Sequence, residues 1–353
     1  MKAIVLSILF AHAVAAADFG VGFNLNFDYA TASVHYANGT SIGIAKIEGG
    51  SSYKRMMRNQ VWEMSSQDPS DVQHDLTQHI ATSSRKTRSQ GIRDHLPPWL
   101  GGRAPDERTQ LIKRMLQSLS SSAEAFTEVK VHDIVIVLPG LPSSEVIEAT
   151  RSATASIGLR LPVLGHSCAP SMAIYANRWA SLGHGEFEEE ECYKWQERLV
   201  LAVDYSRAAL TGVLYAEDCF GLLEGIRGFQ DTDLGKDAAW SKGDAAGRAS
   251  IVEILRQLVR LPVVTDQGNV LNHIHGITLS GEAGYDKQLR SVLKEFFQSE
   301  TGTANFSVVA MHDMSMTSEA MVDPLFAGAM GSAAICWERL EWYETTQGRL
   351  ELR

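Results

Sequence analysis

The clearest pattern of apolar and polar positions lies in residues 272–297. An apolar run that includes Ile277 and Leu279 ends in a small, glycine-bearing turn at residues 280–284. After this turn, apolar residues recur every three to four positions as far as Phe296. The pattern predicts a strand that leads through a tight turn into an amphipathic helix. Glycine at such a turn leaves the backbone open to a flat ligand, although a plain strand-to-helix connection has the same pattern.

Similar patterns along the rest of the chain predict further elements. Strands are expected at residues 20–36, 41–47, 132–138, 161–164, 199–205, 208–216 and 306–310, with a further segment at 219–229. Helices are expected at residues 107–126, 143–157, 173–180, 247–261 and 323–337. Residues 49–106 are polar and interrupted by prolines, which predicts an insert. The order of hairpin, strand and helix occurs twice, so we expect a duplicated α/β architecture with a cleft between its halves.

Composition and charge narrow the class of protein. The chain has 353 residues, enough for about two domains, and its 44% hydrophobic content is sufficient for a sizeable core. Its formal net charge is −10 and its sequence pI is near 5.6. The acidic balance and the absence of a long basic block argue against nucleic acid as the partner.

The first residues have the pattern of a secretory signal peptide. Lys2 supplies a positive start, residues 3–11 an apolar core, and residues 13–17 several small side chains at which cleavage could occur. We therefore expect residues 1–17 to be a signal peptide, the protein to enter the secretory pathway or the extracellular space, and no membrane span to remain after signal removal. A buried first strand at residues 3–10 is the alternative.

Two other features concern the secretory route. The glycosylation sequons that begin at Asn38 and Asn305 suit such a route, but short motifs also arise by chance. The four cysteines are widely spaced, so they permit two disulfides without requiring any, and they do not form a zinc-binding pattern.

Six short segments follow one another in the order of a known set of motifs. They are residues 22–29 (GFNLNFDY), 134–139 (IVIVLP), 166–175 (HSCAPSMAIY), 202–210 (AVDYSRAAL), 279–286 (LSGEAGYD) and 323–334 (DPLFAGAMGSAA). In order, they resemble the first phosphate hairpin, a core strand, the connecting motif, the second phosphate hairpin, the adenosine-binding turn and the closing helix of the superfamily of actin, sugar kinases and seventy-kilodalton heat-shock chaperone ATPases. The likeness is strongest to diverged fungal actin-like ATPase-domain proteins.

This resemblance implies a fold and a set of site residues. The fold is a two-lobed, actin-like (ribonuclease H-like) α/β architecture with a central nucleotide cleft: residues 18–185 form the first lobe with its helical insert, residues 186–340 the second lobe, and residues 341–353 a C-terminal tail. The cofactors it implies are ATP and Mg²⁺. Asp204 would hold the metal and, with Asp28, serve catalysis. The residues that would bind the cofactor are Asn24, Asn26, Ser206, Arg207, Gly281, Glu282, Ala283 and Asp323.

The chain departs from the family pattern where the phosphates would bind. Asn24 replaces the first acid, Asn26 replaces a hairpin glycine, and Phe27 replaces a hydroxyl residue. An asparagine carbonyl still binds cations, but it lacks the charge that helps to hold Mg²⁺. Asp28 could replace the lost acid by a register shift, and Arg207 could neutralise a phosphate. We therefore expect a nucleotide-binding protein whose ATP hydrolysis is weak or absent.

Two other functions fit parts of the sequence. The first is a secreted scaffold or binding protein without catalysis, which would use the two-lobed shape alone. The second is an α/β-hydrolase-type serine esterase, because residues 165–169 (GHSCA) are similar to a nucleophile elbow centred on Ser167. Its triad would be completed by an acid and a histidine in the expected chain order, chosen from Asp204 or Asp266 and from His273, His275 or His312. A metal site at His273 and His275 lacks a third ligand at a compelling spacing.

Overall fold

The computed structural model of the chain describes residues 19–59, 106–140, 143–161, 168–177, 197–218, 221–241, 243–265, 268–300 and 322–351. The expected signal peptide, the expected strand at 306–310, the sequon at Asn305 and the candidate nucleophile Ser167 lie outside these residues. Among the described residues, no helix has both the length and the apolar character needed to cross a membrane.

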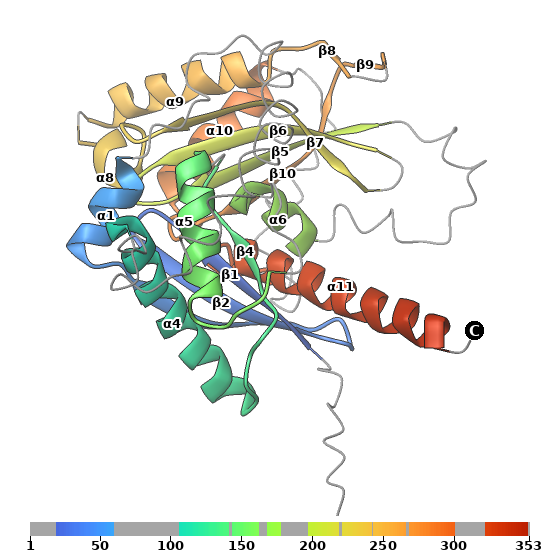
Figure 1. Cartoon of the computed structure of the whole chain (residues 1–353). Helices are drawn as coiled ribbons and strands as arrows, with labels where there is room; N and C mark the ends of the chain where they lie inside the picture. Colours follow the sequence, from blue (N-terminus) through green and yellow to red (C-terminus); the bar gives the residue numbers. More distant parts are fainter. Residues whose placement is uncertain are drawn as a thin grey trace, which may run out of the picture.

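The described strands form two mixed four-stranded sheets, which makes the protein an α/β molecule (Figure 1). The first sheet has the order β3-β2-β1-β4, with β1 (Phe19–Leu25), β2 (Tyr29–Tyr36), β3 (Ser41–Glu48) and β4 (Val135–Val137). The second has the order β10-β5-β6-β7, with β5 (Arg198–Tyr205), β6 (Leu210–Glu217), β7 (Leu223–Asp231) and β10 (Ile274–Ser280). In each sheet three consecutive strands are antiparallel and the fourth runs parallel to the first of them.

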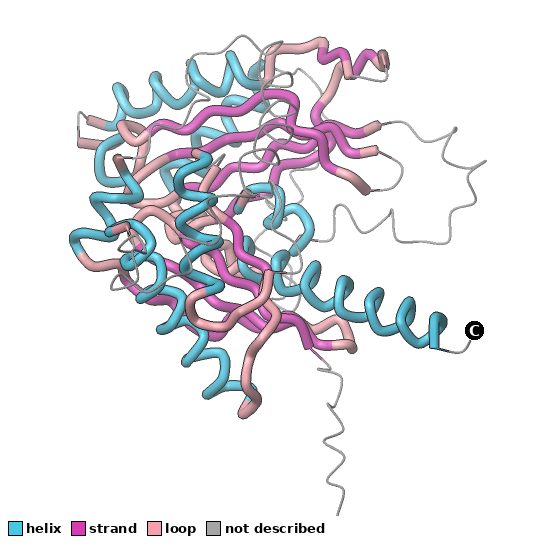
Figure 2. The backbone as a smooth tube through the Cα atoms, in the orientation of Figure 1, coloured by secondary structure: helices cyan, strands magenta, loops and turns pink. Residues whose placement is uncertain are grey.

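Helices cover the sheets and also lie between them (Figure 2). Their bounds are α1 (Ser51–Arg58), α4 (Glu107–Thr127), α5 (Ser144–Ala155), α6 (Ala169–Ala176), α8 (Lys236–Ala239), α9 (Asp244–Leu258), α10 (Lys287–Glu300) and α11 (Ala327–Glu351). Helix α11 packs against β1, β2 and α6, while α6 also packs against β5 and β10. These two helices therefore connect the sheets. A small separate hairpin consists of β8 (Val263–Val264) and β9 (Val270–Leu271).

Each sheet has a hydrophobic core on its outer side. The first core includes Phe23, Leu25 and Phe27 together with Leu116 and Leu119 of α4. The second core combines strands β5, β6 and β10 with apolar residues of α9 and α10. The apolar side chains recur at helical spacing on α9 and α10, so these helices bury one face each.

The inner side of the first sheet is packed unusually closely against α11. A Cβ added at Gly22 would lie 2.2 Å from the carbonyl oxygen of Ala329 and 2.3 Å from the amide nitrogen of Ala333. Small residues on both elements therefore let the helix backbone rest directly on β1. The buried Cys336 lies on the same helix, and it is a free thiol, as is the buried Cys168.

Most predicted elements are present, and several begin or end at other residues. The predicted run at 20–36 is two strands, because Asn26 donates its backbone N–H to the Tyr29 carbonyl and closes a turn there. Helix α11 begins at Ala327 and not at Asp323, since the Asp323 side chain accepts a hydrogen bond from the Leu325 N–H and holds a turn before the helix. The predicted insert begins with an ordered helix, α1.

Candidate functional site

The turns of the two hairpins, residues 24–29 and 204–209, meet in the interior of the protein. Asn26 donates from Nδ2 to Oδ1 of Asp204 over 3.4 Å, and Ser280 donates from Oγ to Oδ2 of the same carboxyl over 2.8 Å. All three side chains are buried. The structure thus brings together the two hairpins that the sequence singled out. They meet through direct contacts between their own side chains.

The Asp204 carboxyl lies in an environment that disfavours its charged form. Burial raises its pKa above that of an exposed aspartate, and the nearby Glu282 carboxylate raises it further. The hydrogen bonds from Ser280 and Asn26 lower the pKa but do not cancel the effect of burial. The carboxylate form, whose negative charge helps to hold Mg²⁺, is therefore disfavoured in this environment.

A network of five charged side chains joins β3 and α1 to Arg207 of the second hairpin and to Glu282 of the Gly281 turn. Arg207 donates from Nε to Glu282 over 2.8 Å and from Nη2 to Glu48 at the end of β3 over 3.1 Å. Lys46 lies 2.9 Å from Glu282 and 2.7 Å from Glu48. Hydrogen bonds from Lys46 and Lys54 lower the pKa of Glu48 to about 2, although partial desolvation opposes them. The network therefore stays charged over the physiological range of pH.

Tyr29 links the first hairpin to the turn at Gly281. Its hydroxyl oxygen accepts a hydrogen bond of 3.0 Å from the backbone N–H of Glu282. The ammonium group of Lys46 lies 4.9 Å from the centre of the Tyr29 ring, within the range of a cation–π contact. Tyr29 is fully buried, and burial raises its pKa well above the usual value. It therefore remains a neutral phenol.

Phe27 stands where the motif that the first hairpin resembles has a hydroxyl residue. Its side chain has 0% exposure and belongs to the same apolar cluster as Ala208 and Ala209 of the second hairpin. The sequence predicted that this bulky group would stand where phosphates pass. In the structure its aromatic ring is instead buried in this apolar cluster.

Asp28 does not join the Asp204 cluster. Its carboxylate receives two hydrogen bonds from the guanidinium of Arg58 on α1, one of them from Nε at 2.7 Å. Tyr53, also on α1, donates to the carbonyl oxygen of Asn26 over 2.9 Å. A pair of this geometry holds α1 against the hairpin. The register shift that would have made Asp28 a substitute metal ligand is not present in the described structure.

The predicted adenosine-binding turn packs against the end of β5 and the turn before α11. Gly281 has a φ of +90°, and a Cβ at this position would lie 2.4 Å from the Tyr205 carbonyl oxygen. Its N–H donates to the Pro324 carbonyl over 2.8 Å, and the Ala283 N–H donates to Tyr205 over 2.9 Å. Glycine is therefore required by the close approach of protein backbone. Asp323 caps its own turn, as described above.

The residues at this site do not fit a magnesium–nucleotide complex. Of the two expected carboxylates, Asp204 has both oxygens engaged by Asn26 and Ser280, and Asp28 is paired with Arg58. Within the described ranges, no group of three or more His, Cys, Asp or Glu side chains is placed to hold a metal ion. We therefore assign no catalytic step to such a complex.

The structure also identifies residues that sequence reasoning missed. Lys46, Glu48 and Ser280 complete the contacts around Arg207 and Asp204. Lys46 and Glu48 occupy alternate positions at the end of a strand, and Ser280 directly precedes Gly281. These positions carry no pattern of their own, so only the three-dimensional arrangement reveals their role.

The strand register places Asp204 and the histidines His273 and His275, three candidates for the alternative esterase triad, at opposite ends of their strands. Strands β5 and β10 are parallel, with Leu199 opposite Ile274 at one end and Asp204 opposite Ser280 at the other. Asp204 therefore lies far from His273 and His275 and cannot orient either imidazole. His275 Nδ1 accepts a hydrogen bond from the Leu199 N–H, and burial lowers its pKa to about 4.

No protein-family model matches this sequence, and no match was found among curated proteins. The interpretation of the function therefore rests on the geometry of the joined hairpins.

The raised pKa of Asp204 leads to a testable pH dependence. The folded protein disfavours the charged form of the Asp204 carboxyl, so this group destabilises the fold when it is ionised. The destabilisation is absent below the pKa of the unfolded chain, near 3.8, and grows as the pH rises through the higher pKa of the folded protein. We therefore expect Asp204→Asn to be more stable than wild type at neutral pH, with a difference that disappears in acid. Urea unfolding of both proteins between about pH 4 and pH 8 measures this. The prediction fails if the stability of Asp204→Asn relative to wild type falls, and does not rise, between acid and neutral pH. Asp106→Asn, at an exposed residue, is the control.

Proposed function

We propose that this chain is a non-catalytic scaffold or binding protein with a duplicated, two-lobed actin-like fold. In the related ATPases a metal–nucleotide complex lies between the phosphate hairpins; here the hairpins bind each other. The observation that carries the proposal is the direct contact of Asn26 with Asp204; the burial of Phe27 in the first hairpin and the Arg207–Glu282 ion pair support it. The equal strand order of the two sheets supports the duplicated fold.

The decisive experiment is thermal melting of the protein with ATP alone and with ATP and Mg²⁺. A ligand at 100 times its dissociation constant adds roughly 2.7 kcal/mol to the free energy of unfolding, which would raise Tm by several degrees. We expect neither addition to raise Tm, and we expect no release of phosphate from ATP. A rise that requires Mg²⁺ would overturn the proposal, because it would mean that the hairpins still hold a metal–nucleotide complex.

Nucleotide binding without hydrolysis is the second candidate. The retained Gly281 turn favours it, because this turn keeps the positive φ and the small residues that resemble an adenosine-binding turn. This candidate predicts a rise in Tm with ATP that is the same with and without Mg²⁺. A matching rise with adenosine would place the binding at the Gly281 turn, since adenosine lacks phosphate groups.

The charged network provides a direct measure of how strongly the hairpins are joined. We expect Arg207→Met to lower the free energy of unfolding by about 1 kcal/mol in low salt and by less in high salt, because its partially exposed ion pairs are screened. Arg151→Met is the matched control, since Arg151 pairs only with its helical neighbour Glu148 on the surface. Equal losses in the two variants would mean that the network adds nothing to the contact between the hairpins.

A further inference from the structure

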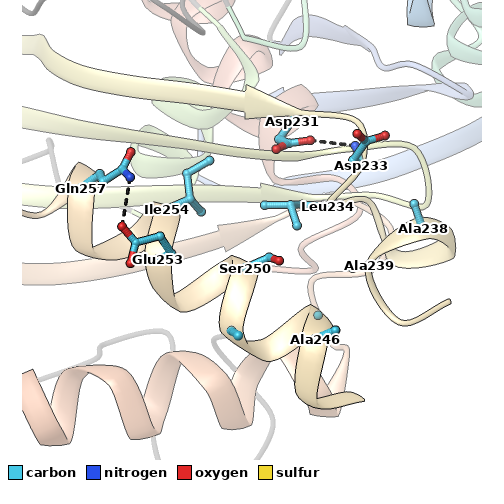
Figure 3. Close-up of a pocket in the computed structure, with 12 residues that line it drawn as sticks. Asp231, Asp233, Leu234, Ala238, Ala239, Ala246, Ser250, Glu253, Ile254 and Gln257 are labelled. Atoms are coloured by element: carbon cyan, nitrogen blue, oxygen red, sulfur yellow. Dashed lines mark hydrogen bonds between the residues drawn. The ribbon is translucent and has the colours of Figure 1, made fainter. Parts of the chain in front are cut away.

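A groove lies between the end of β7, helix α8 and helix α9 (Figure 3). Its volume is about 550 Å³, within the range of ligand sites in proteins. The α9 residues that line it recur at helical spacing and form one stripe along the helix. That stripe consists of Ala246, Gly247, Ala249, Ser250, Glu253, Ile254 and Gln257.

The floor of the groove is apolar and built largely from small side chains. Leu234 and Ile254 face each other across its centre, and Ala238 and Ala239 of α8 close one end (Figure 3). Small side chains allow the backbone of a bound segment to approach closely, while leucine and isoleucine provide apolar contact area. A peptide with at least one apolar side chain matches this floor better than a rigid polar molecule does.

The rim of the groove is acidic on the β7 side. Asp231 accepts a hydrogen bond of 2.7 Å from the Asp233 N–H, which fixes the turn that holds both carboxylates at the rim. Within the described part of the chain, neither carboxylate has an ion-pair partner. Two cations of the neighbouring helices are engaged with other carboxylates: Lys236 of α8 pairs with Asp286, and Arg256 pairs with Glu253 one turn away on α9. The rim therefore has a negative charge that the protein itself does not neutralise.

We propose that this groove binds a short basic segment of a partner protein that carries apolar side chains between its Lys or Arg residues. Charge complementarity selects this occupant, because the two unpaired carboxylates lie beside an apolar floor and the whole chain has a net charge of −10. The proposal does not depend on the state of the hairpins, since none of the groove residues belongs to them.

The groove is nevertheless connected to the second hairpin through α8. The N–H of Lys236 donates to the Ser206 carbonyl over 3.0 Å, and the N–H of Asp237 donates to the Arg207 carbonyl over 3.2 Å. The same short helix presents Ala238 to the groove. A bound segment therefore contacts an element that holds the hairpin carrying Asp204 and Arg207.

The test uses two pools of short fluorescent peptides and the full chain. The basic pool is randomised over Arg, Lys, Leu, Ala and Ser, and the acidic pool has Glu and Asp in place of the cations. We expect wild type to retain the basic pool and not the acidic one, with retention that falls as salt rises. The double variant Asp231→Asn, Asp233→Asn should bind the basic pool about five- to tenfold more weakly. Asparagine keeps the acceptor that holds the Asp233 N–H, so the turn is preserved.

A charge-matched control and a blocking variant test whether the peptides bind in the groove. Asp106→Asn with Glu107→Gln removes the same charge from an exposed helix start and should bind like wild type. Ala249→Arg places a cation on the exposed face of α9 that lines the groove and should abolish retention. Equal retention by the groove variant and its control, or equal retention of both pools by wild type, would overturn the proposal. So would a change in the oligomeric state of the double variant without a change in peptide retention, because the occupant would then be a second copy of the chain.

Discussion

Replacing Phe27 with alanine is expected to lower the free energy of unfolding by about 3–5 kcal/mol, the largest effect of any single truncation proposed for this protein. The side chain is fully buried and packs in a cluster that draws residues from both hairpins. Its removal would leave a cavity at the point where the two hairpins meet, in addition to the lost transfer free energy of the ring. Urea unfolding at neutral pH measures the change, and the thermal midpoint should fall by several degrees.

The matched control for this variant is Phe126→Ala on α4. Phe126 is 45% exposed, so its truncation should cost less than about 1 kcal/mol. Similar losses in the two variants would show that Phe27 does not form part of the core. If instead Phe27→Ala gained an ATP-dependent rise in Tm, the ring would be blocking a competent phosphate site, and the proposed scaffold function would fail.

Replacing Gly22 with valine is expected to cost about 3 kcal/mol or more, because the new side chain would collide with the backbone of α11. Even the first added atom would lie 2.2 Å from the Ala329 carbonyl oxygen, and backbone atoms cannot move aside as the end of a flexible side chain can. The helix would have to separate from β1, which would also disturb its contact with α6. Circular dichroism during thermal unfolding gives the loss of stability.

Gly225→Val on the edge strand β7 provides the comparison for this prediction. A Cβ at Gly225 would make only ordinary contacts, the nearest at 3.7 Å from the Tyr215 ring, and valine favours extended backbone. This variant should be neutral or slightly more stable than wild type. Equal stability of the two valine variants would mean that α11 is not held against β1 in solution.

The sequence predicted the strands of this fold better than it predicted the contacts of the site. Apolar runs such as residues 199–205 and 274–279 form strands because both faces of these two strands are buried, so the pattern and the structure have the same cause. The α/β class and the mixed sheets are confirmed on that ground. The duplicated actin-like architecture, the boundaries of the lobes, and the expected secretion remain predictions.

The site was only partly predictable, for physical reasons that differ from residue to residue. Asn26 and Phe27 replace a glycine and a hydroxyl residue of the phosphate hairpin that the sequence resembles, and this mismatch is readable from the sequence alone. The partners of Arg207 are not readable, since Glu48 and Glu282 lie 159 and 75 positions away and long charged side chains can reach many neighbours. The engagement of Asp28 by Arg58 depends on how α1 docks, and helix docking has no local signature.

The position of α11 has a consequence for the synthesis of this protein. The inner surface of β1 is completed by residues near 329–333, so ribosomes translate all the intervening residues before that surface can be covered. At about 5–20 residues per second, the interval lasts on the order of tens of seconds. During that time the first sheet would present an uncovered glycine-rich face to other nascent chains, and molecular chaperones that recognise such faces would be expected to associate with it until translation reaches the helix.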